Sequence, residues 1–174
     1  MRIVGISGSL QAGSANTALL VVARARAAEG VEVVLFDALA AIPAFNPDTV
    51  EPPAAVADLR GLVQSADGLV IATPEYAFGL PGALKNALDW LVGTGELYEK
   101  PVVVVSAAPS AERGLNARAD LERTLRGQGA RVLASATIAV PTRMRGQEID
   151  DPTITTAVDT AVATLVDDQH SRQR

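Results

Sequence analysis

The chain of 174 residues contains no cysteine and one histidine, and aromatic residues make up 3% of it. Without cysteine there is no disulfide framework, no thiol nucleophile and no thiolate metal site. The histidine, His170, lies in a polar stretch near the C-terminus, which argues against His-based triads and most zinc chemistry. We therefore expect neither a catalytic constellation of side chains nor a metal site.

Positive charge and long apolar runs are also scarce. The formal net charge is −5, which disfavours nucleic acids and anionic membranes as partners, because both reward clustered Lys and Arg. No apolar run approaches the about 18 residues that a membrane helix needs. The apolar stretch at residues 3–6 is too short for a signal peptide. We therefore expect a cytoplasmic protein.

Short runs rich in valine and isoleucine alternate with amphipathic stretches along the chain. Continuous apolar runs such as residues 69–72 are typical of strands covered on both faces, as in a parallel sheet. The repeat predicts a three-layer α/β sandwich: a five-stranded parallel sheet of order 2-1-3-4-5 with helices on both faces. The expected strands are residues 2–6, 32–36, 68–73, 102–107 and 131–140, and the expected helices are residues 16–29, 54–66, 82–92, 115–126 and 153–167.

The length and the even composition predict one domain, over residues 1–168. Residues 38–53 contain four prolines and are expected to form a long surface loop. Residues 169–174 are polar and are expected to be a disordered tail.

A loop rich in glycine and hydroxyl groups follows the first expected strand and leads into a helix. A helix N-terminus favours an anion, and Ser9, Ser14 and Asn16 add uncharged hydrogen-bond donors. Ser14 or Asn16 could instead serve only as the helix N-cap, which would explain one of them but not the set. The loop lacks both the dinucleotide and the Walker glycine patterns. It therefore predicts a site for a phosphate monoester of a mononucleotide.

A second loop lies in the segment of residues 69–90, between an apolar strand and a helix. It places Glu75, Tyr76 and Phe78 at the carboxyl end of a strand, where open α/β sheets bind ligands. The two aromatic rings favour a ligand-facing loop, although they could also cover the sheet end or lie in a subunit interface. Trp90 lies on an apolar helix stripe and is expected in the core.

These segments together resemble the NADPH-dependent FMN reductase family, a flavodoxin-like group that includes quinone, azo-dye and chromate reductases. The resemblance extends to about residue 140. It is carried by the element order, by Gly8-Ser9 with Ser14-x-Asn16-Thr17, by the Pro-rich connection at residues 37–48, and by Pro74-Glu75-Tyr76 continuing into residues 81–90.

The resemblance implies a flavodoxin-like fold and an FMN site. Its phosphate would be held by Ser9, Ser14, Asn16 and Thr17, and its ring would be lined by Pro74, Glu75 and Tyr76, with Ser106 on the other side. Gln11 and Ala77 occupy two further cofactor-binding positions, but the family usually has arginine and asparagine there. Residues 106–114 hold alanines and a proline where the family favours glycines. Each lost polar contact is expected to weaken FMN binding, by about 1 kcal/mol or up to about 3 if charged.

The resemblance also implies the activity. We expect an FMN-dependent oxidoreductase that passes a hydride from NADPH or NADH to a small-molecule acceptor such as a quinone or free flavin. The alternatives are a non-catalytic flavin carrier and a binding protein with weakened or lost FMN binding. Arg113 could meet the 2′-phosphate of NADPH or be a solvated loop residue. Family members commonly form dimers or tetramers, so we expect a homodimer or homotetramer with residues 91–98 in the contact.

Overall fold

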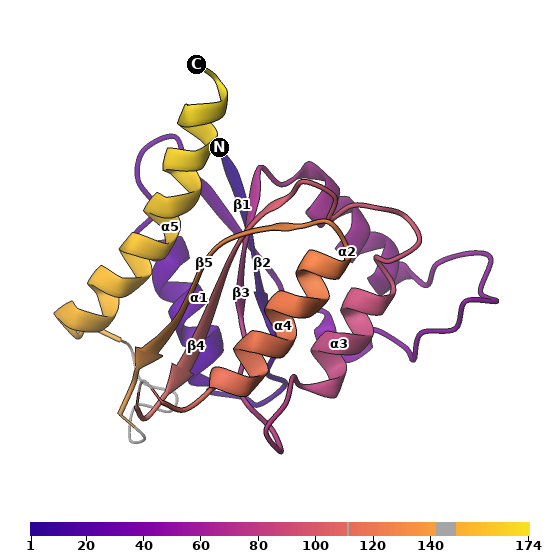
Figure 1. The fold of residues 1–174 in the computed structure, drawn as a ribbon, viewed down its shortest axis with the longest axis horizontal. Coiled ribbons are helices and arrows are strands. Elements are labelled where there is room, and N and C mark those ends of the chain that lie inside the picture. Colours follow the sequence, from indigo (N-terminus) through magenta and orange to yellow (C-terminus); the bar gives the residue numbers. More distant parts are fainter. Residues whose placement is uncertain (111, 142–148) are drawn as a thin grey trace.

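One parallel sheet organises the molecule (Figure 1). The computed structural model describes residues 1–110, 112–141 and 149–174. The strand order is β2-β1-β3-β4-β5, as predicted. The strands are β1 (Arg2–Ser7), β2 (Glu32–Phe36), β3 (Gly68–Ala72), β4 (Pro101–Ala108) and β5 (Arg131–Ala139).

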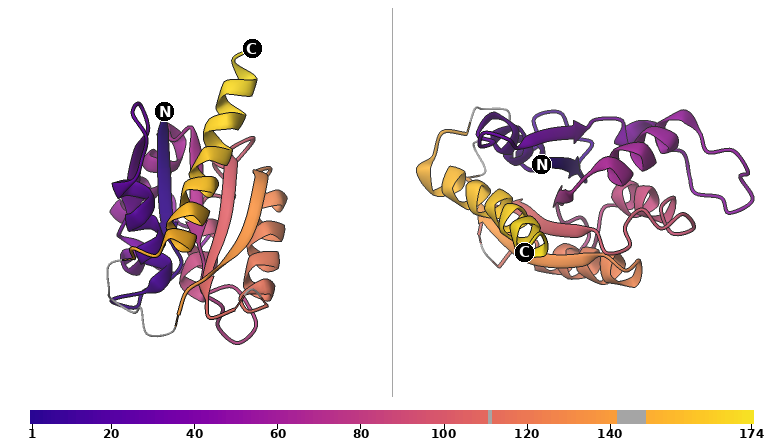
Figure 2. Two further views of the ribbon diagram at one scale, coloured as in Figure 1. Left: turned by 90° about the vertical axis from the view of Figure 1, so that its left-hand side faces the viewer. Right: turned by 90° about the horizontal axis from the view of Figure 1, so that it is seen from above.

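The helices cover both faces of the sheet, as the turned views show (Figure 2). Alternate strand residues point to opposite faces, so Val4, Ile71 and Val104 pack on one side and Ile3 and Val70 on the other. The first side is covered by α2 (Ala54–Ser65), α3 (Gly82–Asp89) and α4 (Leu115–Gly127), and the second by α1 (Ala15–Ala25) and α5 (Pro152–Arg172). Burial on both faces explains the continuous apolar runs in β3 and β4.

The Pro-rich segment of residues 38–53 is held to α3 at its start. It begins with the short 3-10 helix η1 (Leu39–Ala41) and then runs out from the molecule (Figure 1). The indole Nε1 of Trp90 donates to the Pro43 carbonyl at 2.9 Å, and the Phe45 ring meets the indole edge-on at 5.2 Å between ring centres. Trp90 is buried, so its predicted place in the core is confirmed.

Three helix ends differ from the sequence-based expectation by three residues or more. Helix α3 ends at Asp89, where residue 92 was expected. Helix α1 ends at Ala25, not at residue 29, and Gly30, with φ +80°, lies in the turn that leads into β2. Helix α5 continues to Arg172, where a disordered tail from residue 169 was expected. Ion pairs hold this helix end to the body: Asp168 pairs with Arg131 at the start of β5, and Arg172 lies 3.7 Å from Glu99.

The described helices include none that combines the length and the apolar character needed to cross a bilayer.

Candidate cofactor site

A cleft of about 630 Å³ lies at the carboxyl ends of β1, β3, β4 and β5. This volume falls within the about 300–1,000 Å³ of small-molecule sites, and the edge is the one at which open α/β sheets bind ligands. Eight of the ten predicted cofactor-binding residues line it. They are Ser9, Gln11, Ser14, Asn16, Pro74, Glu75, Tyr76 and Ser106.

The β1–α1 loop forms the first wall of the cleft. Gly8 lies at its start, and a Cβ there would lie 2.8 Å from Cδ2 of Leu84, so a larger residue would require the buried Leu84 side chain to shift. Ser14 occupies the N-cap position of α1 and is buried, but its hydroxyl makes no capping hydrogen bond. Capping therefore does not account for Ser14 in this structure. The N-terminus of α1 opens on the cleft with its helix dipole available to an anion.

Asn16 and Thr17 follow on α1, and only Asn16 reaches the cleft. The Asn16 Oδ1 accepts a hydrogen bond of 2.9 Å from the backbone N–H of Ala107, which fixes the start of α1 to the end of β4. The Thr17 hydroxyl instead lies 2.7 Å from the Ser7 hydroxyl, behind the loop. Thr17 therefore contacts the end of β1 and does not line the cleft.

The β3–α3 loop forms the second wall and contains a tight two-residue turn. The backbones of Tyr76 and Gly79 exchange two hydrogen bonds, of 3.2 and 3.0 Å. The residues between them, Ala77 and Phe78, both have positive φ, at 49° and 61°. Such turns prefer Asn-Gly, because side chains other than Asn or Asp are strained there. Ala77 therefore lies at the tip of the turn and does not line the cleft.

Glu75 connects this second wall to α4. Its Oε2 accepts hydrogen bonds from the backbone N–H groups of Asn116 at 2.9 Å and Ala117 at 3.1 Å. These are first-turn amides of α4, so the carboxylate occupies the position of a helix cap. The N-terminus of α4 thus carries a carboxylate, whereas Ser14 at the N-terminus of α1 makes no capping hydrogen bond.

The end of β4 and the β4–α4 loop form the third wall. Ser106 is fully buried, and its hydroxyl has no hydrogen-bond partner among the described residues. Buried polar groups are rarely unpaired, so a hydroxyl in this state is typical of a site that a ligand completes. Gly114 has φ +81°, and a Cβ on it would lie 2.5 Å from the Ser106 hydroxyl oxygen.

The β4–α4 loop carries two adjacent charged residues: Arg113, which lines the cleft, and Glu112, which does not. Within the described part of the chain, no lysine or arginine other than Arg113 lines the cleft. The Ser110 hydroxyl hydrogen-bonds Glu112 and lowers the pKa of that exposed carboxyl. Glu112 is therefore anionic at neutral pH.

Nine lining residues are not among the ten predicted. They are Ala15, six residues at the end of β4 and in the β4–α4 loop (Ala107, Ala108, Pro109, Ser110, Arg113 and Gly114), and Val140 and Pro141. Val140 and Pro141 follow β5, whose carboxyl end lies at the same edge as those of β1 and β3. The predicted strand order already implied this placement, although no residue type there signals ligand contact. In the described ranges, no group of three His, Cys, Asp or Glu side chains could hold a metal ion.

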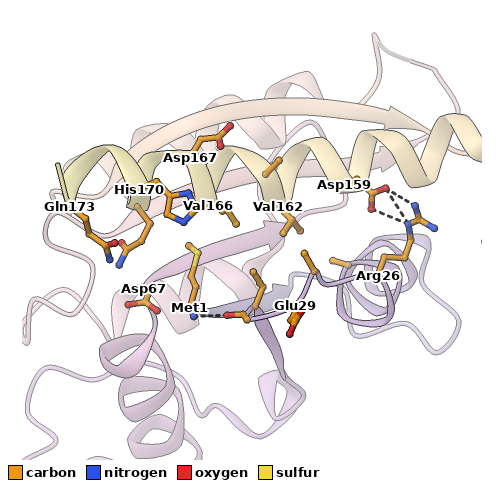
Figure 3. A pocket seen from close by; sticks show the side chains of 16 residues that line it. Met1, Arg26, Glu29, Asp67, Asp159, Val162, Val166, Asp167, His170 and Gln173 are labelled. Atoms are coloured by element: carbon orange, nitrogen blue, oxygen red, sulfur yellow. Dashed lines mark hydrogen bonds and ion pairs between the residues drawn. The ribbon is translucent and has the colours of Figure 1, made fainter.

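A larger cavity, of about 750 Å³, lies at the opposite end of the sheet (Figure 3). Met1, Asp67, His170 and Gln173 surround one end of it, and the ion pair of Arg26 with Asp159 lies at the other. Met1 and Asp67 precede β1 and β3, so this cavity is at the amino ends of the strands. Ligands of open α/β sheets bind at the carboxyl ends, and the 630 Å³ cleft is therefore the candidate cofactor site.

The strand order and the position of the cleft at the carboxyl ends of the strands define the class: a flavodoxin-like α/β protein. A statistical description of the NADPH-dependent FMN reductase family matches residues 1–144. The chain belongs to this family.

Individual relatives agree with this assignment. An NAD(P)H-dependent FMN reductase of Pseudomonas aeruginosa is 36% identical over 129 residues, which are 72% of this chain and 69% of the relative. A quinone reductase of Escherichia coli K12 is 33% identical over 130 residues, with the same coverage of 72% and 69%. The flavoenzyme FerB of Paracoccus denitrificans has the same fold, with a TM-score of 0.76 at 23% identity over 95% of this chain and 97% of FerB.

Proposed function

We propose that this protein is an FMN-dependent NAD(P)H oxidoreductase that passes a hydride from a reduced nicotinamide nucleotide to a small acceptor. Membership of the family supports this activity. One structural observation carries it: the N-terminus of α1, where Ser14 makes no capping bond, and the Ser106 hydroxyl, which has no partner among the described residues, belong to one cleft. An anionic phosphate and a polar ring edge would satisfy them, and FMN offers both.

The residues of the first wall would hold the phosphate. Ser9, Gln11 and Ser14 present hydroxyl and amide groups beside the N-terminus of α1. The Gln11 side chain is uncharged, so the attraction would come from the helix dipole and neutral donors rather than from an ion pair. Asn16 would keep this wall at a fixed distance from β4 through its bond to Ala107.

The second and third walls would enclose the flavin ring. Pro74, Glu75 and Tyr76 would line one side of it, and the Ser106 hydroxyl would hydrogen-bond its polar edge from the other. FMN, when bound, supplies the hydride acceptance and the electron transfer, so the protein needs no acid–base pair of its own. The chain's part is to orient the ring and exclude water.

Quinones are the acceptor class that we propose, because a quinone reductase is among the relatives. Arg113 lines the cleft and is proposed to meet the phosphate groups of the nicotinamide donor, either NADPH or NADH. We also propose that the protein works in the cytoplasm as a homodimer or homotetramer.

The visible spectrum of the purified protein tests the proposal. After addition of FMN and dialysis, the protein should keep a flavin absorbance band, and anaerobic NADPH should bleach it. Subsequent addition of a quinone should restore the band. Protein that retains no flavin would rule out the enzyme and favour a binding protein, and bound flavin that NADPH cannot reduce would favour a flavin carrier.

A further inference from the structure

Glu75 provides the carboxylate cap of α4. The N-cap residue is Gly114, which has no side chain that could accept a hydrogen bond, and no side-chain cap bond comes from it. Glu75 Oε2 accepts hydrogen bonds from the N–H groups of Asn116 and Ala117, and so replaces the acceptor that an N-cap side chain would provide. A residue 41 positions away in the sequence performs this role.

The two segments that Glu75 joins are walls of the same cleft. Glu75 follows Pro74 on the β3–α3 loop, and the amides belong to the first turn of α4, directly after the β4–α4 loop with Arg113 and Gly114. A shift of the Glu75 carboxylate would therefore change the distance between these walls. A flat ligand held between them would be sensitive to that distance.

The β3–α3 loop needs such an external support, because its own turn is strained. Positive φ at Ala77 and Phe78 costs free energy in each residue. Strained backbone persists only where the surroundings hold it. The attachment of Glu75 to α4 lies directly before the turn and gives it that anchor.

We propose that Glu75 is a positioning residue: by capping α4 from the facing wall, it sets the separation of the β3–α3 and β4–α4 loops at which FMN is bound. This inference rests on the proposed function. It assigns to the Glu75 carboxylate a role in holding the walls together instead of direct contact with the ligand.

The test compares FMN affinity and the spectrum of bound FMN in four proteins: wild type, Glu75→Ala, Glu75→Gln and Asp151→Ala. Asp151 is the matched control, because its side chain caps α5, with Oδ1 2.8 Å from the Thr153 N–H, and does not line the cleft. Glu75→Ala should raise the FMN dissociation constant about tenfold or more, in line with the loss of hydrogen bonds to a charged group. The visible band of its bound FMN should move toward that of free FMN.

The other two variants separate positioning from stability. The glutamine of Glu75→Gln has the same length as glutamate and keeps an acceptor oxygen. This variant should therefore retain most of the FMN affinity and the wild-type spectrum. Asp151→Ala should lower the urea midpoint, as loss of a cap does, while FMN affinity and spectrum stay unchanged. Amide hydrogen exchange at Asn116 and Ala117 should become faster in Glu75→Ala without FMN.

Wild-type affinity and spectrum in Glu75→Ala would overturn the inference while leaving the proposed function intact. If wild type itself binds no FMN, the proposed function fails and this inference fails with it. Should Glu75→Ala not fold, Glu75→Asp takes its place, because the shorter side chain keeps the charge but loses the reach. Wild-type affinity in Glu75→Asp would then overturn the inference.

Discussion

At the scale of single residues, the turn at Ala77 and Phe78 is the clearest departure from local preference. Phe78 has φ 61° and is 81% exposed in the single chain, so packing within the chain does little to offset the strain. Phe78→Gly should therefore raise the free energy of unfolding by about 1 kcal/mol relative to Phe78→Ala, because glycine adopts positive φ without a Cβ clash. Urea unfolding of the two variants measures this difference, and equal midpoints would contradict the strain.

Ser14 provides the residue-scale test of the phosphate site. Ser14→Asp places a carboxylate beside the position proposed for a dianionic phosphate, and FMN binding should be lost. Ser14→Ala removes only a hydroxyl, and should weaken binding by about 1 kcal/mol. Fluorescence titration of FMN measures both. Similar affinities for the two variants would show that the phosphate lies elsewhere.

The sequence located the loops of the site better than it located individual side chains. Ser9, Gln11 and Ser14 line the cleft as predicted, because any loop after β1 must open at that edge. Thr17 and Ala77 do not line it. The direction of Thr17 depends on the rotation of α1, and that of Ala77 on a turn type that its residue type disfavours. The capping role of Glu75 depends on a contact with α4, whose amide lies 41 positions later in the sequence. A local sequence pattern contains no sign of such a contact.

At the scale of elements, α1 and α5 are joined by an exposed ion pair. Arg26 donates to both carboxylate oxygens of Asp159, at 2.6 to 3.3 Å. The hydrogen bond from Arg26 and its charge lower the pKa of Asp159. The pKa of Asp159 is lower in the folded state than in the unfolded state. The ion pair therefore stabilises the fold fully at pH values above the ordinary pKa of an aspartate carboxyl. This stabilisation is lost as the pH falls through the folded-state value.

We therefore expect Asp159→Asn to lower the urea midpoint at pH 7, and wild type and variant to converge below about pH 4. Asp58→Asn is the control, since Asp58 is exposed on α2 and forms no ion pair with any described residue. Urea unfolding at both pH values is the measurement. A difference between wild type and Asp159→Asn that persists unchanged at low pH would show that the pair is not the cause.

The ends of the helices could not be predicted for a related reason. Apolar periodicity shows where a helix is covered by the sheet, and it predicted α5 only as far as residue 167. The helix reaches Arg172, where Asp168 pairs with Arg131 at the start of β5 and Arg172 pairs with Glu99 just before β4. Such pairs join residues far apart in the sequence, so the local pattern contains no sign of them.

At the scale of the whole molecule, the sheet order followed from the sequence because few orders satisfy five parallel strands with crossover helices. The sequence determines the contact between subunits less well than it determines the sheet order. Residues 91–98 are apolar in sequence, but Leu91 and Leu97 are buried in their own core, which leaves Val92 and Tyr98 exposed. Four further exposed apolar side chains lie at the cleft edge of the sheet: Leu10, Tyr76 and Phe78 in loops and Leu115 at the start of α4. Val21 on α1 and Phe45 and Val50 in the Pro-rich segment are also exposed, away from that edge.

We therefore expect the proposed homodimer to use the cleft edge, with Phe78 in the contact. A stable interface needs about 1,000 Å² or more of buried surface, and the four apolar side chains would supply its centre. Sedimentation equilibrium should give twice the chain mass of 18.0 kDa for wild type and the single chain mass for Phe78→Glu. Val92→Glu is the matched control, because it adds the same charge at an apolar side chain that is 59% exposed in the other segment. Dissociation by Val92→Glu and not by Phe78→Glu would place the contact at residues 91–98, and a monomeric wild type would exclude the dimer.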